Sequence, residues 1–186
     1  MEAKRDLEGK TLLRDFSGLL ESRNLNEEDR TIEFPFSSET PVDRGYLGKE
    51  ILDHREGSID FSRLNAAAPL LFNHNPDVVL GVVERGYLDK KTKRGMAKVR
   101  FAKNQAGEEA FDLVKEGVYR NVSFGYSVNE TEEMEDGAYR VTSFTPAEVS
   151  LVSVPADFSV GVSRAKDDES VDKTVTNTQQ QPTISD

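Results

Sequence analysis

The chain has 186 residues, of which 36% are hydrophobic and 8% aromatic, enough for one domain that buries roughly 70% of its unfolded surface. It contains no cysteine, which excludes disulfides, thiolate zinc sites and a cysteine nucleophile. Its net charge of -10 argues against a general nucleic-acid binder, because phosphate binding rewards clustered lysine and arginine.

The first thirty residues form a polar arm in which acidic and basic side chains surround short apolar groups such as Leu12-Leu13. Residues 1–10 alternate charges and do not resemble a signal peptide, and no apolar run approaches the ~20 residues that cross a bilayer. We therefore expect a cytosolic protein with no membrane partner. The arm itself is expected to be loosely held and partly helical.

The residue pattern over 31–164 predicts a β-rich domain. Side chains alternate over 31–36, and residues 78–83 are continuously apolar. A basic turn over residues 89–95 joins the strand that ends near Leu88 to an alternating strand over 96–101. The basic turn is either a solvated connection or a docking site for an acidic scaffold.

One helix and a second hairpin follow. Asn104 can cap a helix over residues 106–116 that Gly117 ends. Ala110, Phe111 and Val114 share one face of it. An acidic connection over 129–137 then predicts an antiparallel pair of strands, 124–128 and 139–144. Residues 165–186 are predicted to be a disordered tail, or a linker to a further domain such as a capsid protein.

His74 is the first candidate for chemistry. The chain has two histidines, and His74 follows three bulky apolar residues at the point where a buried strand breaks into a turn. An imidazole there is partly shielded yet able to reach a cleft, as a general base must. The pattern also fits a hydrogen-bonded histidine at the end of a strand with no catalytic role.

Ser123 is the candidate nucleophile. It lies in an alternating strand, on the same face as Gly125 and Ser127. Gly125 leaves open space beside the hydroxyl in which a substrate backbone could lie. A structural serine on a tightly packed sheet face is the alternative. No Gly-x-Ser-x-Gly motif surrounds it, so the geometry of an α/β-hydrolase is not supported.

Glu148 is the candidate acid. Alternation places it on one face with Ser150, Val152 and Val154, which is at least half buried. An unpaired carboxylate there would cost several kcal/mol or take up a proton, and an imidazole N–H would relieve that cost. A strand-end charge turned toward solvent is the alternative.

Several short blocks, in a fixed order, together resemble one known family: Pro41–His54, Ile59–Leu64, Leu70–Asn75, Leu80–Glu84, Gly117–Tyr126 and Glu148–Ala156. In this order they resemble the prohead (procapsid maturation) proteases of HK97-type tailed phages, over roughly residues 31–164. The resemblance implies an α+β protein, mainly β: a small, mostly antiparallel β-barrel flanked by helices, similar to the herpesvirus assembly proteases.

The resemblance also implies an activity and a site. It implies a serine endopeptidase that removes scaffold segments from the major capsid protein, often cleaves itself, and acts inside the immature procapsid in the host cytoplasm. We also expect a homo-oligomer without a cofactor, and without a metal, because two histidines scattered among solvent-facing acids lack the ligand spacing of a zinc site. The family's histidine falls on His74, its nucleophile on Ser123 and its acid on Glu148. Because the herpesvirus enzymes use a second histidine, His54 competes with Glu148 for the third role.

Two other functions stay open at this point. The chain could be a catalytically inactive capsid-assembly or structural β-barrel, or a small-ligand-binding β-barrel with the Gly125 face as the floor of its pocket. If the chain is a protease, we expect self-cleavage in residues 1–30 or 165–186, because a scissile segment must be extended and unpaired.

Overall fold

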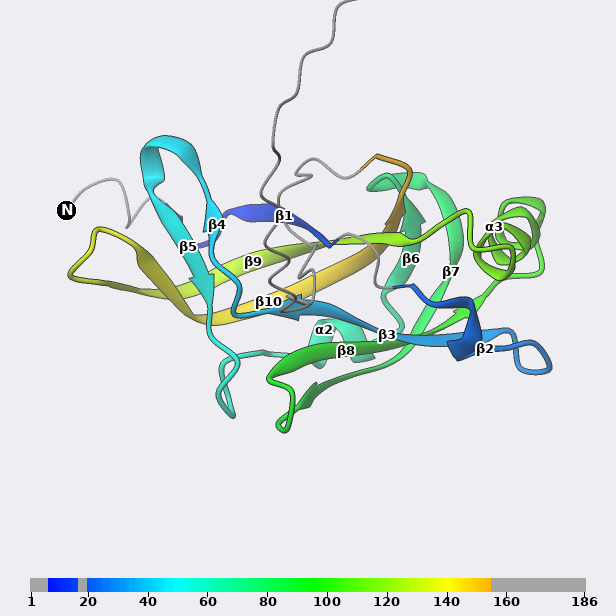
Figure 1. Cartoon of the computed structure of the whole chain (residues 1–186), viewed down its shortest axis with the longest axis horizontal. Helices are drawn as coiled ribbons and strands as arrows, with labels where there is room; N and C mark the ends of the chain where they lie inside the picture. Colours follow the sequence, from blue (N-terminus) through cyan, green and yellow to red (C-terminus); the bar gives the residue numbers. More distant parts are fainter. Residues whose placement is uncertain (1–6, 17–19, 155–186) are drawn as a thin grey trace, which may run out of the picture.

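Ten strands form one mixed, mostly antiparallel sheet in the computed structural model, which describes residues 7–16 and 20–154. Its main path runs in the order β1-β9-β10-β6-β7-β8-β3-β2 (Figure 1). In chain order these strands are β1 Thr11–Phe16, β2 Leu25–Asn26, β3 Thr31–Ser38, β6 Pro69–Phe72, β7 Asn75–Asp89, β8 Arg94–Phe101, β9 Asn121–Glu133 and β10 Tyr139–Val152. The short strands β4 Val42–Asp43 and β5 Lys49–Leu52 pair with each other, and β5 also pairs with β10.

The two predicted hairpins are confirmed. β7 pairs antiparallel with β8 across the basic turn, and β9 pairs antiparallel with β10 across the acidic connection. Both β9 and β10 extend beyond the predicted segments. The β9–β10 pairing places Ser150 opposite Ser123 and Glu148 opposite Gly125, so two candidate groups meet through local register.

The sheet is not closed into a barrel, so that part of the expected fold is wrong. β10 divides its second edge between two parallel partners: residues 139–141 pair with β5, and residues 149–151 pair with β6. The sheet therefore branches at β10. Among the described strands, its main path ends at β1 on one side and at β2 on the other.

The arm expected to be loose and partly helical instead adds strands to this sheet. β1 pairs antiparallel with β9 over its whole length, and β2 pairs with β3. An exposed β9 edge would present unpaired backbone N–H and C=O groups, and β1 satisfies them. The predicted tail over residues 165–186 lies outside the described residues.

Within residues 7–16 and 20–154 the helices are few and short. They are α3 Gln105–Lys115, a single turn α2 Ser62–Asn65, and the 3-10 turns η1 Ser22–Asn24 and η2 Gly45–Leu47. α3 packs on β7 and β8, and α2 on β7 and β10 (Figure 1). In the described part of the chain, none of the helices is long and apolar enough to span a membrane.

The predicted helix α3 is confirmed with its cap. The Asn104 side chain accepts a hydrogen bond from the Gly107 backbone N–H at 2.9 Å, and Ala110, Phe111 and Val114 are its buried apolar residues. Replacing Asn104 with alanine leaves that N–H without its acceptor. We expect the free energy of unfolding to fall by about 1 kcal/mol, measured by urea denaturation. An unchanged denaturation midpoint would show that the cap contributes nothing.

An aromatic cluster lies beneath the candidate serine. The rings of Phe36 and Phe124 are 5.0 Å apart, those of Phe124 and Tyr126 are 4.9 Å apart, and those of Tyr126 and Phe144 are 5.7 Å apart. All four residues are fully buried. Close packing on this face of β9 fixes the strand, so the opposite face can hold Ser123 in one position.

Candidate active site

His74 lies in a two-residue turn that joins β6 to β7. Phe72 pairs with Asn75, and the two residues between them, Asn73 and His74, have φ angles of 49° and 59°. Tight hairpins favour such left-handed residues, although a non-glycine residue pays roughly 1 kcal/mol or more for that conformation. The Asn73 N–H donates to the Leu151 carbonyl at 2.9 Å, which fixes the turn against β10. His74 is thus aimed by a strained, anchored turn.

The structure brings His74, Ser123 and Glu148 together in one line. Ser123 Oγ lies 2.7 Å from His74 Nε2, and Glu148 Oε1 lies 2.6 Å from His74 Nδ1. With the proton on Nδ1, the ring donates to the carboxylate and leaves Nε2 free to accept the hydroxyl proton. The His74 and Glu148 side chains are 19% and 15% exposed, while Ser123 is fully buried. This geometry can activate a serine hydroxyl.

Ser150 is a fourth member of the site, to which the sequence analysis gave no role. Its hydroxyl donates to Glu148 Oε2 at 2.7 Å and accepts the His74 backbone N–H at 3.2 Å. It therefore ties the carboxylate and the histidine turn to the same strand. The sequence offered one indication of this role: Ser150 lies two residues after Glu148, on the same face of β10.

Gly125 has a different role from the one expected. A Cβ atom there would lie 2.8 Å from Glu148 Oε1, so the space beside the serine is filled by the carboxylate and not left open for a substrate backbone. The glycine allows Glu148 to cross the face of β9 and reach His74.

Replacing Gly125 with alanine should therefore displace the Glu148 carboxylate from the imidazole. We expect the rate at which Ser123 reacts with a fluorophosphonate to fall by roughly 10- to 100-fold, because a displacement of about 1 Å in a catalytic group has that order of effect. Gly137 to alanine is a comparison variant, since a Cβ there meets nothing within 4 Å, although its φ of 79° adds strain. Equal rates for the wild type and the Gly125 variant would contradict this account.

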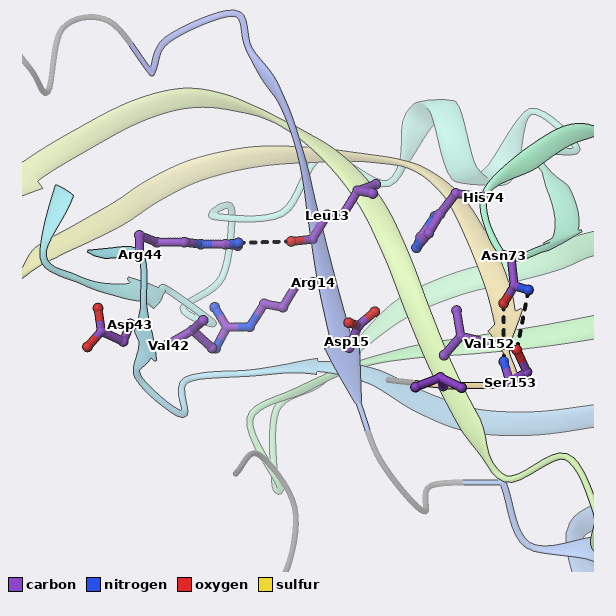
Figure 2. Close-up of a pocket in the computed structure, with 11 residues that line it drawn as sticks. Leu13, Arg14, Asp15, Val42, Asp43, Arg44, Asn73, His74, Val152 and Ser153 are labelled. Carbon is purple, nitrogen blue, oxygen red and sulfur yellow. Dashed lines mark hydrogen bonds between the residues drawn. The ribbon is translucent and has the colours of Figure 1, made fainter. Parts of the chain in front are cut away.

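β1 covers the serine from the outer side of β9. Asp15 is the register partner of Ser123, and Ser123 Oγ is 3.0 Å from the Arg14 carbonyl oxygen. Beside β1 is a cavity of about 720 Å³, and His74 and Arg44 lie on opposite sides of the strand (Figure 2). Its lining is Leu13, Arg14, Asp15, Val42, Asp43, Arg44, Asn73, His74, Val152, Ser153 and Val154.

A buried charge cluster holds the side chain of Arg14, in the same part of β1. Glu50 on β5 is fully buried, and its Oε1 accepts from Tyr126 Oη at 2.6 Å, from Arg44 Nη2 at 2.9 Å and from Arg14 Nη1 at 3.4 Å. Burial, followed by the Glu50 charge, raises the pKa of Tyr126. The phenol therefore stays a hydrogen-bond donor to the carboxylate. Sequence reasoning missed this cluster.

His54, the competitor for the third catalytic role, has other partners. Its Nδ1 donates to the Leu52 carbonyl at 3.0 Å, and its Nε2 then accepts from the Ser37 hydroxyl at 2.8 Å. Burial lowers the pKa of His54. In this structure Glu148, and not His54, contacts His74. Within the described residues, no group of three or more His, Asp or Glu side chains is placed to hold a metal ion.

Residues 52–174 match the sequence profile of the caudovirus prohead serine proteases, and His74, Ser123 and Glu148 all lie inside the match. The chain belongs to this family. The chain is also 43% identical over 138 residues to the major capsid protein of Halomonas phage phiHAP-1, an alignment that covers 70% of the chain and 23% of that relative. The chain therefore spans about a quarter of the relative it matches.

The fold of this family member is also similar to that of the bacteriophage T4 capsid assembly protease gp21. The two structures superpose with a TM-score of 0.51 at 12% sequence identity, over 78% of this chain and 98% of the other. At that identity the likeness concerns the fold alone. The profile match over residues 52–174 confirms the expected family, and the superposition shows that a phage capsid protease has a similar fold.

Proposed function

We propose that this chain is a serine endopeptidase of capsid maturation that cuts the capsid protein and its scaffold segment inside the procapsid. The observation that carries the proposal is the line of hydrogen bonds from Glu148 through His74 to Ser123, at 2.6 and 2.7 Å. Family membership supports the same class of enzyme.

The mechanism assigns one role to each group. His74, in its neutral form, takes the Ser123 proton as the hydroxyl oxygen adds to a peptide carbonyl, and then gives it to the departing amine. Glu148 fixes the ring tautomer and stabilises the imidazolium. Water then attacks the resulting ester with His74 again acting as the base, which releases the acid and restores the serine.

The choice of substrate rests on different support. The relative from Halomonas phage phiHAP-1 is named a major capsid protein, and the family is named for the prohead. Both fit an enzyme that meets capsid protein during assembly, in the interior of the immature particle. A fully buried nucleophile beneath β1 also fits a protease whose activity is delayed.

The test is co-expression of the chain with the capsid protein of the same phage. The wild type should shorten the capsid protein, whereas Ser123→Ala and His74→Ala should leave it at full length. An inactive assembly protein would give full-length capsid protein in all three cases and no labelling of Ser123 by a fluorophosphonate. A ligand-binding protein would also leave the capsid protein intact, and Ser123→Ala would lower its affinity for the ligand.

A further inference from the structure

β1 lies where a substrate of this site would have to lie. It is an extended segment added antiparallel to β9, and one of its carbonyl groups, that of Arg14, is 3.0 Å from Ser123 Oγ. Peptides are commonly recognised as an added strand, in which the main chain supplies the hydrogen bonds and alternate side chains supply specificity. A peptide bound in the same register would present the carbonyl of its Arg14-equivalent residue to the hydroxyl.

A second contact holds the backbone of β1 next to this carbonyl. Arg44 donates from Nη1 to the Leu13 carbonyl at 3.0 Å, and Figure 2 shows this bond crossing the cavity to β1. The same Arg44 binds Glu50 through Nη2 at 2.9 Å. It recognises main chain, which any sequence carries, and so serves as a clamp for whichever strand lies on β9.

The Arg14 side chain points to the other face of β1 and enters a pocket built for a cation. The residue is 2% exposed; Nη1 lies 3.4 Å from Glu50 Oε1, and Nη2 donates to the Thr40 carbonyl. Tyr126 and Tyr139 also donate to Glu50, so the buried carboxylate accepts hydrogen bonds from two phenols as well as from the guanidinium. Among the described residues, Arg14 Nε has no hydrogen-bond partner, although it is buried.

We propose that β1 occupies the substrate-strand site of the enzyme, and that the Glu50 pocket selects arginine or lysine on the N-terminal side of the scissile bond. This inference rests on the proposed peptidase function and adds its specificity. β1, Arg14 and Glu50 all lie outside residues 52–174, the stretch that matches the family profile.

The chain's own bond in this register is Arg14–Asp15. Ser123 Oγ adds to the Arg14 carbonyl carbon and passes its proton to His74; the bond to the Asp15 nitrogen then breaks, and His74 protonates the new amine. Water hydrolyses the acyl-enzyme and gives a carboxylate on residues 1–14. Since β1 already lies on Ser123, the first cut occurs within one molecule.

The pocket chemistry sets the expected selectivity. An apolar side chain would leave the buried Glu50 with one cation fewer, and an acidic side chain would add a like charge beside it. A site built for hydrogen bonding rejects analogues that lack the matching group far more strongly than an apolar pocket does. We expect cleavage after arginine to exceed cleavage after alanine by about 100-fold or more, with lysine in between.

The first test follows the intact mass and new N-terminus of the wild-type full chain. We expect a product that begins at Asp15, formed at a rate independent of protein concentration and absent from Ser123→Ala. Arg14→Lys should still be cut, and Arg14→Ala should be cut at this bond at least tenfold more slowly. Arg23→Ala is the matched control, because Arg23 lies in the same arm with a side chain 80% exposed.

Labelling of Ser123 with a fluorophosphonate distinguishes a purely structural role of Arg14 from the proposed role in substrate recognition. If Arg14→Ala merely unfolds the site, labelling is lost together with the cut. Under the proposal the variant still labels, at least as fast as the wild type, because β1 is held less firmly over the serine. Loss of labelling in Arg14→Ala would therefore overturn the proposal, as would a Ser123-reactive wild type that is never cut between Arg14 and Asp15.

The second test uses the processed enzyme and quenched peptides with the sequence of residues 9–16. The parent peptide carries arginine at position 14, and three others carry lysine, alanine or glutamate there. Equal kcat/KM for arginine and alanine, in an enzyme that still trims capsid protein, would overturn the pocket assignment alone. No labelling of Ser123 and no capsid trimming would instead overturn the peptidase function.

Discussion

Replacing Ser123 with alanine should lower the rate of capsid-protein cleavage by about 10⁴- to 10⁶-fold, the range found when a catalytic serine is removed from other proteases. The hydroxyl lies 2.7 Å from His74 Nε2, so the variant removes the group whose proton this nitrogen would take. Cleavage is followed by the length of the capsid protein with time. The variant should show no fluorophosphonate labelling.

His74→Ala is the companion to this variant. Serine and histidine act as one unit, so the double variant should lose little more activity than either single one. Thermal unfolding is the folding control, because Ser123→Ala removes a buried hydroxyl that lies within hydrogen-bond distance of the Arg14 carbonyl oxygen and of His74 Nε2. If an alanine variant that folds like the wild type still trimmed the capsid protein within tenfold of its rate, Ser123 would not be the nucleophile.

Replacing Glu148 with glutamine should lower the same rate by about 10³- to 10⁴-fold, as found when the buried carboxylate of a serine protease becomes an amide. An amide N–H turned toward Nδ1 forces the imidazole proton onto Nε2, and the ring can then no longer accept the Ser123 proton. The alternative amide orientation keeps the tautomer but loses the negative charge that stabilises the imidazolium. The rate of fluorophosphonate labelling measures the effect directly.

His54→Gln is the matched comparison for this variant, since it tests the competing histidine with the same replacement. His54 binds Ser37 and the Leu52 carbonyl, so we expect its labelling rate to stay within a few-fold of wild type once folding is checked by thermal unfolding. A Glu148 variant with a wild-type rate, together with a His54 variant that loses activity, would move the third role to His54.

Local pattern was enough to predict the longer elements of the sheet and the helix α3. The cap at Asn104, the two hairpins and the turn at His74 each depend on neighbours within a few residues, and the structure contains all of them. The meeting of Ser123 with Glu148 also follows from the hairpin, once β9 and β10 are in register. Sequence resemblance supplied the link to His74, which no periodicity could provide.

Long-range pairing explains what sequence reasoning missed. β1 lies in a polar arm and pairs with β9 through backbone N–H and C=O groups. Such pairing does not require a recognisable pattern of side chains in the sequence. Arg14 and Glu50 are 36 positions apart, and their contact depends on β5 branching from β10. The prediction of a closed barrel was wrong for the same reason. The sheet branches because one edge of β10 pairs with both β5 and β6, and long-range pairing of this kind cannot be read from a local residue pattern. Gly125 was identified as a special position, but its neighbour Glu148 could only be named from register.

The parallel pairing of β6 with β10 has a consequence for synthesis on the ribosome. The turn that carries His74 follows β6 directly. The strand segment that pairs with β6, residues 149–151 of β10, is translated more than seventy residues later. Until β10 emerges, the Asn73 N–H lacks the Leu151 carbonyl and His74 lacks the Glu148 carboxylate, so a nascent chain cannot form the line of side chains described above. Under the proposed function, cleavage activity is therefore expected only in a molecule whose sheet is complete.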